Sequence, residues 1–129
     1  MNVLVVVVAV VVSLPTFARA QSTAEIDAVA VSPNHYKILL ENEHVRVVEY
    51  TLQPGERDNW HTHPPKTSYV VNGGTFRIHF SDGSSVVSEA KKGTAVWADT
   101  VPRHYAENVG ATSITIILVE VKGPKPGAS

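Results

Sequence analysis

The chain has 129 residues, a length that fits one domain. Its 11 basic and 12 acidic residues give a formal net charge of −1 with neutral histidines, and no basic patch stands out, which argues against nucleic acid as a partner. There is no cysteine, so disulfides are excluded and any metal site has to be built from histidine and carboxylate.

The first twenty residues have the pattern of a secretory signal peptide. Residues 3–12 form a valine-rich apolar run, shorter than the about 20 residues that span a bilayer, and Ala18-Arg19-Ala20 is a small-x-small cleavage pattern. No Lys or Arg precedes the run, so an uncut membrane anchor or a misassigned start codon is the alternative. We predict a signal peptide over 1–20, cleavage after Ala20, a secreted or periplasmic protein and no membrane contact after cleavage.

The rest of the chain divides into an N-terminal arm over 21–35, a barrel over 36–122 and a flexible tail over 123–129. Short β-branched segments alternate with turn residues at intervals of about eight to twelve residues, which is typical of a β-sandwich or barrel. One of these turns, Asn72-Gly73-Gly74, is expected to use the positive φ that glycine allows. No helical period follows the signal segment. The expected strands are 36–41, 45–52, 60–63, 67–71, 75–80, 85–90, 94–98, 104–108 and 113–121.

Three of the six histidines form a pattern. His61 and His63 are two residues apart on an expected strand, so their imidazoles point to the same face. His104 follows Gly93 and a bend at Pro102. Imidazole suits Zn, Fe, Cu and Ni. The pattern predicts a metal site made of His61, His63 and His104.

These residues resemble the two motifs of the cupin superfamily. The first motif is Gly, five residues, His-x-His, three or four residues, Glu, six residues and Gly, and the second leads from Gly to His, three residues and Asn. The positions that match are Gly55, His61, His63, residue 67 and Gly74 in the first motif, and Gly93, His104 and Asn108 in the second. The resemblance covers about residues 36–121. It implies an all-β, single-domain jelly-roll barrel similar to the small bacterial cupins of the β-alanine degradation type, and a homodimer, which Val-rich edge strands would suit.

Two positions depart from the motifs. Thr67, beside Lys66, stands where the family has Glu, and Asp99-Thr100-Val101 replaces a Pro-x-Gly turn. Three neutral imidazoles leave the full charge on a divalent ion, so the site should favour anionic chelating ligands. Resemblance to three-histidine cupins implies Fe(II), with Zn, Mn, Ni or Cu as alternatives. A carboxylate from elsewhere could complete the ligand set, and the candidates are Glu49, Glu56, Asp58 and Glu120.

Tyr69 is the candidate catalytic residue. It shares strand parity with Thr67, so we expect it to face the interior near the metal, where a phenol can act as a base or a hydrogen-bond donor. Cupin lyases that split dimethylsulfoniopropionate use a tyrosine in a similar place. The alternative is a tyrosine that only fills the barrel.

Three functions remain open. The first is a three-histidine Fe(II)-dependent dioxygenase acting on a small organic substrate, such as a thiol or a diketone. The second is a non-redox lyase or isomerase in which the metal is a Lewis acid and Tyr69 moves a proton. The third is a non-catalytic cupin that binds a small molecule or a sugar. The missing Glu favours the first over the second slightly, and the lack of an acid–base pair besides Tyr69 favours the first and the third over the second. The expected pocket is small and apolar, lined by Val, Ile, Phe and Thr.

Overall fold

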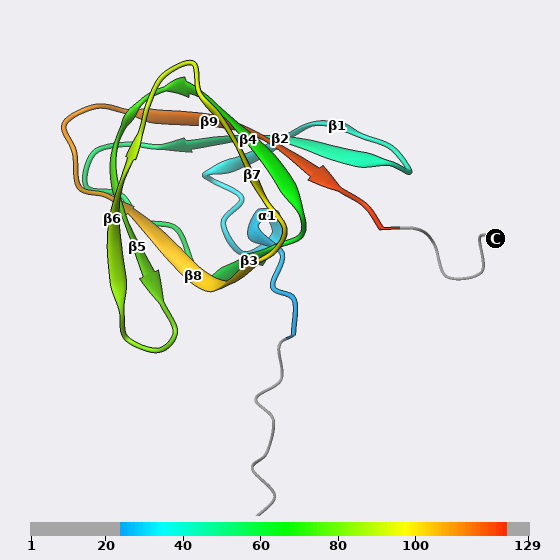
Figure 1. Cartoon of the computed structure of the whole chain (residues 1–129), viewed down its shortest axis with the longest axis horizontal. Coiled ribbons are helices and arrows are strands. Elements are labelled where there is room, and N and C mark those ends of the chain that lie inside the picture. The colour runs from blue at the N-terminus through cyan, green and yellow to red at the C-terminus, as the bar shows by residue number, and fades with distance from the viewer. Residues whose placement is uncertain (1–23, 124–129) are drawn as a thin grey trace, which may run out of the picture.

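The computed structural model describes residues 24–123, and these form two antiparallel sheets that face each other (Figure 1). One sheet has the strand order β1-β2-β9-β4-β7 and the other β3-β8-β5-β6. The elements are α1 (Ala28–Val31), β1 (Tyr36–Glu41), β2 (Val45–Leu52), β3 (His61–His63), β4 (Lys66–Asn72), β5 (Gly74–Phe80), β6 (Ser85–Ala90), β7 (Ala95–Ala98), β8 (Val101–Asn108) and β9 (Ile114–Val121). The prediction of an all-β jelly roll is confirmed.

The predicted signal segment and residues 124–129 of the tail lie outside the described range. Within that range, no helix is long and apolar enough to cross a membrane. The one helix there was not expected from the sequence: α1 is a single turn in the N-terminal arm, begun by Asp27, whose side chain accepts a hydrogen bond from Val29 N. Capping by Asp explains why this turn can form without a helical apolar period.

Strands β2 and β9 form the centre of the larger sheet and show why the chain folds this way. They pair in continuous register from Val45–Val121 to Leu52–Ile114. Alternate residues are buried on each, among them Val48 and Leu118. β-Branched and aliphatic side chains fit this pleated, half-buried surface, and each buried one contributes about 1.5–3 kcal/mol. The core therefore lies between the sheets, on the faces that also carry the site.

The two open sides of the sandwich differ. On one side the N-terminal arm covers the free edge of β3, because Ile26 N and Thr62 Oγ1 are 2.9 Å apart and Thr62 N donates to Ile26 O at 2.9 Å. On the other side lie the edge strands β6 and β7. Val86 pairs with Ile78 and Val96 with Ser68, so both face the interior, yet they are 53% and 62% exposed. Solvent thus reaches the interior along the β6–β7 edge.

The glycines between β4 and β5 serve a different purpose from the one expected. Positive φ occurs at Gly55, Gly83 and Gly93, and not at Gly73 or Gly74. A Cβ on Gly73 would lie 2.3 Å from Ala90 O, and one on Gly74 would lie 2.8 Å from Ile114 Cγ1. The expectation of positive φ here is wrong: this turn needs glycine for close packing between strands.

Asn108, the last motif residue, has a structural role. Its buried amide donates 2.8 Å hydrogen bonds to Leu52 O and Thr112 O, and its Oδ1 accepts one from Gly110 N at 3.0 Å. The side chain thereby joins the ends of β2 and β8 to the turn that leads into β9.

Replacing Asn108 with Ala should destabilise the protein by about 3 kcal/mol, because buried carbonyl groups would lose their donor. Urea unfolding followed by circular dichroism measures this. Asn72→Ala is the matched control, since Asn72 is exposed at the end of β4, and should change stability by less than about 0.5 kcal/mol. Equal losses in the two variants would contradict the role assigned to Asn108.

Candidate metal centre

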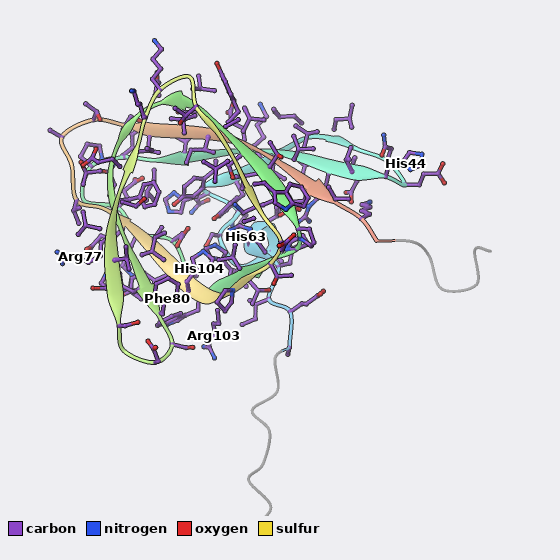
Figure 2. The ribbon with its side chains drawn as sticks, viewed as in Figure 1. His44, His63, Arg77, Phe80, Arg103 and His104 are labelled. Atoms are coloured by element: carbon purple, nitrogen blue, oxygen red, sulfur yellow. The ribbon has the colours of Figure 1, made fainter. Side chains whose placement is uncertain are left out.

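The three predicted histidines lie together on the interior face of the smaller sheet. His61 on β3 pairs directly with His104 on β8, and His63 follows two residues later on the same face. All three side chains are buried, between 1% and 6% exposed. One nitrogen from each lies within 4.8 Å of those of the others, and His61 Nε2 and His63 Nε2 are 3.0 Å apart. Figure 2 shows His63 and His104 between the sheets, whereas His44 lies at the tip of the β1–β2 hairpin.

The outer nitrogen of each ring faces an acceptor. His61 Nδ1 lies 2.7 Å from Asn59 O, and His104 Nδ1 lies 2.7 Å from Pro102 O. Because a carbonyl can only accept, these two Nδ1 atoms carry protons and each Nε2 keeps a lone pair. His63 Nδ1 faces the carboxylate of Glu120, with 3.7 Å between Nδ1 and Oε1. Such outer partners are typical of histidines that bind a metal through Nε2.

The spacing of the inner nitrogens suits a single ion. His61 Nε2 and His63 Nε2 lie 3.0 Å apart, a distance that either a proton on His63 Nε2 or a cation between the two nitrogens would satisfy. Ligands about 2.1 Å from a metal and about 90° apart are about 3.0 Å from each other. The three-histidine group could therefore hold a divalent metal ion, and imidazole nitrogens suit iron, zinc, copper and nickel.

Burial keeps His63 and His104 neutral. It lowers the pKa of His63 to about 3 and that of His104 to about 4, and the nearby His61 and Lys66 add to both shifts. Glu120 opposes the shift at His63, and the bond to Pro102 O opposes it at His104. A neutral imidazole is the form that binds a metal, so both groups are ready to do so at neutral pH.

Asp58 places a buried negative charge behind His61. Its carboxylate accepts hydrogen bonds from the hydroxyls of Tyr36 at 3.1 Å and Tyr50 at 3.0 Å, and from Ala106 N at 2.7 Å. The nearest ionisable nitrogen is His61 Nδ1, at 3.9 Å from Oδ1, and no Lys or Arg of residues 24–123 lies within 4.0 Å. An isolated buried charge is costly. A cation held by the histidines would balance it.

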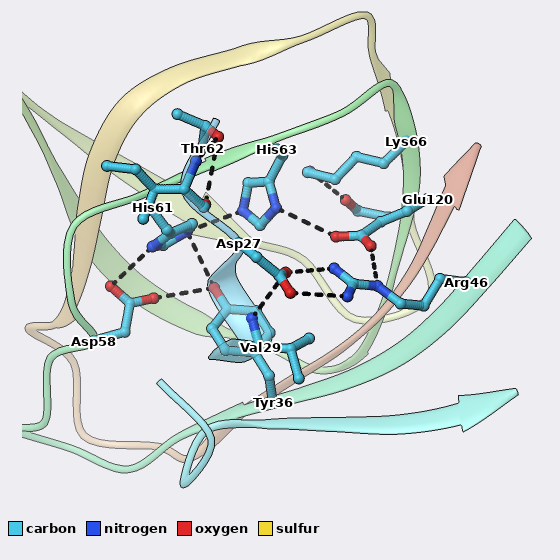
Figure 3. Close-up of polar contacts among 12 residues, drawn as sticks. Asp27, Val29, Tyr36, Arg46, Asp58, His61, Thr62, His63, Lys66 and Glu120 are labelled. Carbon is cyan, nitrogen blue, oxygen red and sulfur yellow. Dashed lines mark hydrogen bonds and ion pairs between the residues drawn. The ribbon is translucent and has the colours of Figure 1, made fainter. Parts of the chain in front are cut away.

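Glu120 is the second carboxylate beside the group, and it connects His63 to the N-terminal arm (Figure 3). Arg46 donates to Glu120 at 2.6 Å through Nε and to Asp27 at 2.6 Å through Nη2. Burial alone would raise the pKa of Glu120, but the contacts with His63 and Arg46 outweigh it and lower the pKa. Glu120 is thus ionised near neutral pH and places a negative charge 3.7 Å from His63 Nδ1, which makes no hydrogen bond.

The four carboxylates considered as additional ligands fall into two pairs. Asp58 and Glu120 lie next to ligand histidines, but on the Nδ1 side, away from the converging nitrogens. Glu49 pairs with Lys37 on the outer face of the larger sheet, and Glu56 lies 3.8 Å from His35 near the surface. Within the described part of the chain, the group contains histidines alone.

Tyr69 does not face the histidines, so the expectation of an interior tyrosine at this position is wrong. On β4 it is Val70 that is buried, whereas Tyr69 is 48% exposed on the outer face. Tyr69 and Thr67 do lie on the same face of β4, but that face is the outer one. Pro64 and Pro65 carry the chain from one sheet to the other, so side-chain parity is not continued from β3 to β4.

A different tyrosine occupies the site. The buried hydroxyl of Tyr36, at the start of β1, lies 3.2 Å from His61 Nε2. Burial raises the pKa of Tyr36 well above its usual value, and Tyr50 and Asp58 add to the shift, so the phenol keeps its proton. No short-range signal could have found this residue, because it lies 25 positions before His61 and meets it only through the sandwich.

No protein-family model matches the chain, and no curated protein does. Solved structures do match. A cupin domain from Bordetella pertussis Tohama I aligns with a TM-score of 0.63 and 24% identity over 68% of this chain and 92% of its own. An RmlC-like cupin family protein from Methanocaldococcus jannaschii aligns with a TM-score of 0.56 and 15% identity over 91% and 96%. A Klebsiella pneumoniae protein with a double-stranded β-helix domain aligns with a TM-score of 0.52 and 26% identity over 66% of this chain and 74% of its own.

These likenesses, together with the two facing antiparallel sheets, show that the chain has the cupin fold, the double-stranded β-helix. The cupin fold that the motifs predicted is therefore confirmed. The chain's similarity to the β-alanine degradation type stays a prediction.

Proposed function

We propose that the chain binds a divalent metal through His61, His63 and His104 and acts as an Fe(II)-dependent dioxygenase on a small organic substrate. One observation carries the proposal: three buried Nε2 atoms converge while the outer nitrogens of the same rings face acceptors. A ligand set of three neutral imidazoles, with no carboxylate among the described residues that join it, leaves positions and charge for an anionic substrate.

The roles of the chain's own groups follow from their contacts. The three imidazoles hold the ion, and the carbonyls of Asn59 and Pro102 fix two of the rings. Asp58 and Glu120 supply negative charge behind the rings. When bound, iron would supply the redox chemistry with dioxygen that no side chain in the barrel can perform.

Oxygen consumption tests the reaction. Untagged protein loaded with Fe(II) is mixed with a panel of thiols and diketones, and dioxygen uptake is followed with an electrode. Uptake with one class, absent in zinc-loaded protein, supports an oxygenase. A flat trace with the whole panel, from protein shown to contain stoichiometric iron, would argue against it.

Glu120→Gln should weaken metal binding by about tenfold, because the His63 ring loses the nearby negative charge that increases its basicity. Competition with a chelator of known affinity measures the change. Glu43→Gln is the matched control, since Glu43 lies exposed in the β1–β2 turn and should leave the affinity unchanged. If both variants bind the metal as tightly as the unaltered protein, Glu120 does not have this role.

The position of Tyr36 favours a second candidate, a non-redox lyase or isomerase. Its hydroxyl, fixed by Asp58, is the proton donor nearest to the converging nitrogens. In this case zinc-loaded protein would be active, and Tyr36→Phe would lower kcat while Tyr69→Phe would not. Equal activity of the Tyr36 variant and the unaltered protein would exclude this mechanism.

A further inference from the structure

Lys66 is a cation on the interior face of the barrel, one residue before the position where the cupin motif carries Glu. It is the first residue of β4 and pairs with Glu120 on one side and Ala98 on the other. Cross-strand partners share a face, and Glu120 is buried, so Lys66 points inward while Thr67 points out. Figure 3 shows Lys66 close to His63 and Glu120.

The ammonium group of Lys66 makes one hydrogen bond and no ion pair within the described residues. Its Nζ donates to Ser68 Oγ at 2.9 Å, and within residues 24–123 no carboxylate oxygen lies within 4.0 Å of it. Glu120, the nearest carboxylate along the strand register, is already bonded to Arg46. Burial lowers the pKa of Lys66 and Glu120 partly opposes this. An ammonium offers three donors, so those that Ser68 does not use remain for a ligand.

Lys66 acts electrostatically on the histidine group. Its charge contributes to the lowered pKa of both His63 and His104, which lie on the opposite sheet. An ion bound there would add two positive charges to the one on Lys66. Arg46 is shared by Glu120 and Asp27, so these three groups carry one net negative charge and Asp58 adds a second. One positive charge then remains, and a bound anion would balance it between the sheets.

The interior face of β5, on the sheet opposite Lys66, is apolar. Phe76, Ile78 and Phe80 on β5 pair with Asn108, Ala106 and His104, so all three face the barrel interior, and they are half-buried. Beyond them lies the β6–β7 edge, where Val86 and Val96 face inward and are exposed. A molecule entering along this edge would meet aromatic and aliphatic side chains first and the histidines and Lys66 further in.

From this arrangement we infer the substrate class: a small carboxylic acid with an apolar body, whose carboxylate is recognised by Lys66 and whose body packs on Ile78 and Phe80, the β5 residues nearest to His104. The inference rests on the proposed metal binding, because the same molecule would reach the ion. It makes Lys66 the residue that determines specificity for acids over neutral compounds.

Calorimetry on zinc-loaded protein tests this with mandelate, an aromatic hydroxy acid, and with mandelamide, its uncharged counterpart. Lys66→Met keeps the length of the side chain and removes the charge, and Lys66→Arg keeps the charge. We expect mandelate to bind the unaltered protein and the Arg variant, and to bind the Met variant at least about tenfold more weakly, as for a lost charge-assisted hydrogen bond. Mandelamide should bind all three alike.

Two further measurements distinguish a failure of metal binding from a failure of the role assigned to Lys66. Elemental analysis of each sample shows whether the ion is present, so that a failure of the metal proposal is recognised before any titration. Lys92→Met, in the exposed β6–β7 turn, should bind mandelate like the unaltered protein. Mandelate binding by the Met variant that stays within about twofold of the unaltered protein, or no mandelate binding by zinc-loaded unaltered protein, would overturn the role of Lys66.

Discussion

Protein carrying His61→Ala or His104→Ala is expected to contain less than about a tenth of the metal found in the unaltered protein after purification without a histidine tag. Each substitution removes one of three converging nitrogens and leaves two buried imidazoles, too few to hold an ion against solvent and buffer. Elemental analysis of dialysed samples measures the content. We expect a large effect because, among the described residues, no carboxylate and no fourth histidine belongs to the group.

His44→Ala is the control for this experiment. His44 lies at the tip of the β1–β2 hairpin with a side chain 78% exposed, so its loss should leave the metal content unchanged (Figure 2). Circular dichroism shows whether each variant is folded. Stoichiometric metal in a folded His104→Ala protein would mean that the ion is bound elsewhere. Absence of metal from the unaltered protein under every loading condition would remove both enzyme proposals.

Metal-free protein is expected to lose stability on mild acidification, by about 4 kcal/mol between pH 8 and pH 5. In the folded state the pKa is about 3 for His63 and about 4 for His104, against about 6.5 for each in the unfolded chain. The unfolded state therefore binds more protons below pH 6.5. The stabilisation is complete above that pH and declines as pH falls towards 4 and then 3. Urea unfolding at a series of pH values measures it.

The same groups set the pH at which the metal leaves. Because protons compete poorly for buried imidazoles, zinc should stay bound well below pH 6.5, the value at which exposed histidines become charged. His44→Ala should keep the slope of stability against pH, whereas a His63→Asn/His104→Asn double variant should lose most of it. A stability that is flat between pH 8 and pH 5, or release of zinc near pH 6.5, would contradict the burial assigned to these ligands.

The sequence predicted the fold because local patterns and the overall architecture agree. Alternation in β2 and β9, and the turns at Gly55, Gly83 and Gly93, are short-range features, and the spacing of His61 and His63 places both on one face of a strand. His104 joined the group through its motif spacing, and the structure brings it opposite His61 in direct register.

The parts that could not be predicted depend on long-range contacts or on changes of face. Tyr69 is expected inside because it shares parity with Thr67 at the motif position of Glu, but the chain changes sheets at Pro64-Pro65 and both residues face outward. Tyr36 reaches the histidines from the other sheet across 25 positions, without a local pattern. Glu120, one of four candidate carboxylates, does so across 57 positions. The same change of face makes Lys66, and not Thr67, the interior residue at the position of the missing glutamate.

X-ray absorption spectroscopy of zinc-loaded protein tests the central claim, that His61, His63 and His104 bind one ion through Nε2. The account predicts nitrogen neighbours at about 2.0–2.1 Å and the outer-ring scattering of three imidazoles in the unaltered protein, and loss of this three-imidazole signal in His104→Ala protein. A first shell with fewer than two imidazoles in the unaltered protein, or a spectrum unchanged by His104→Ala, would contradict it.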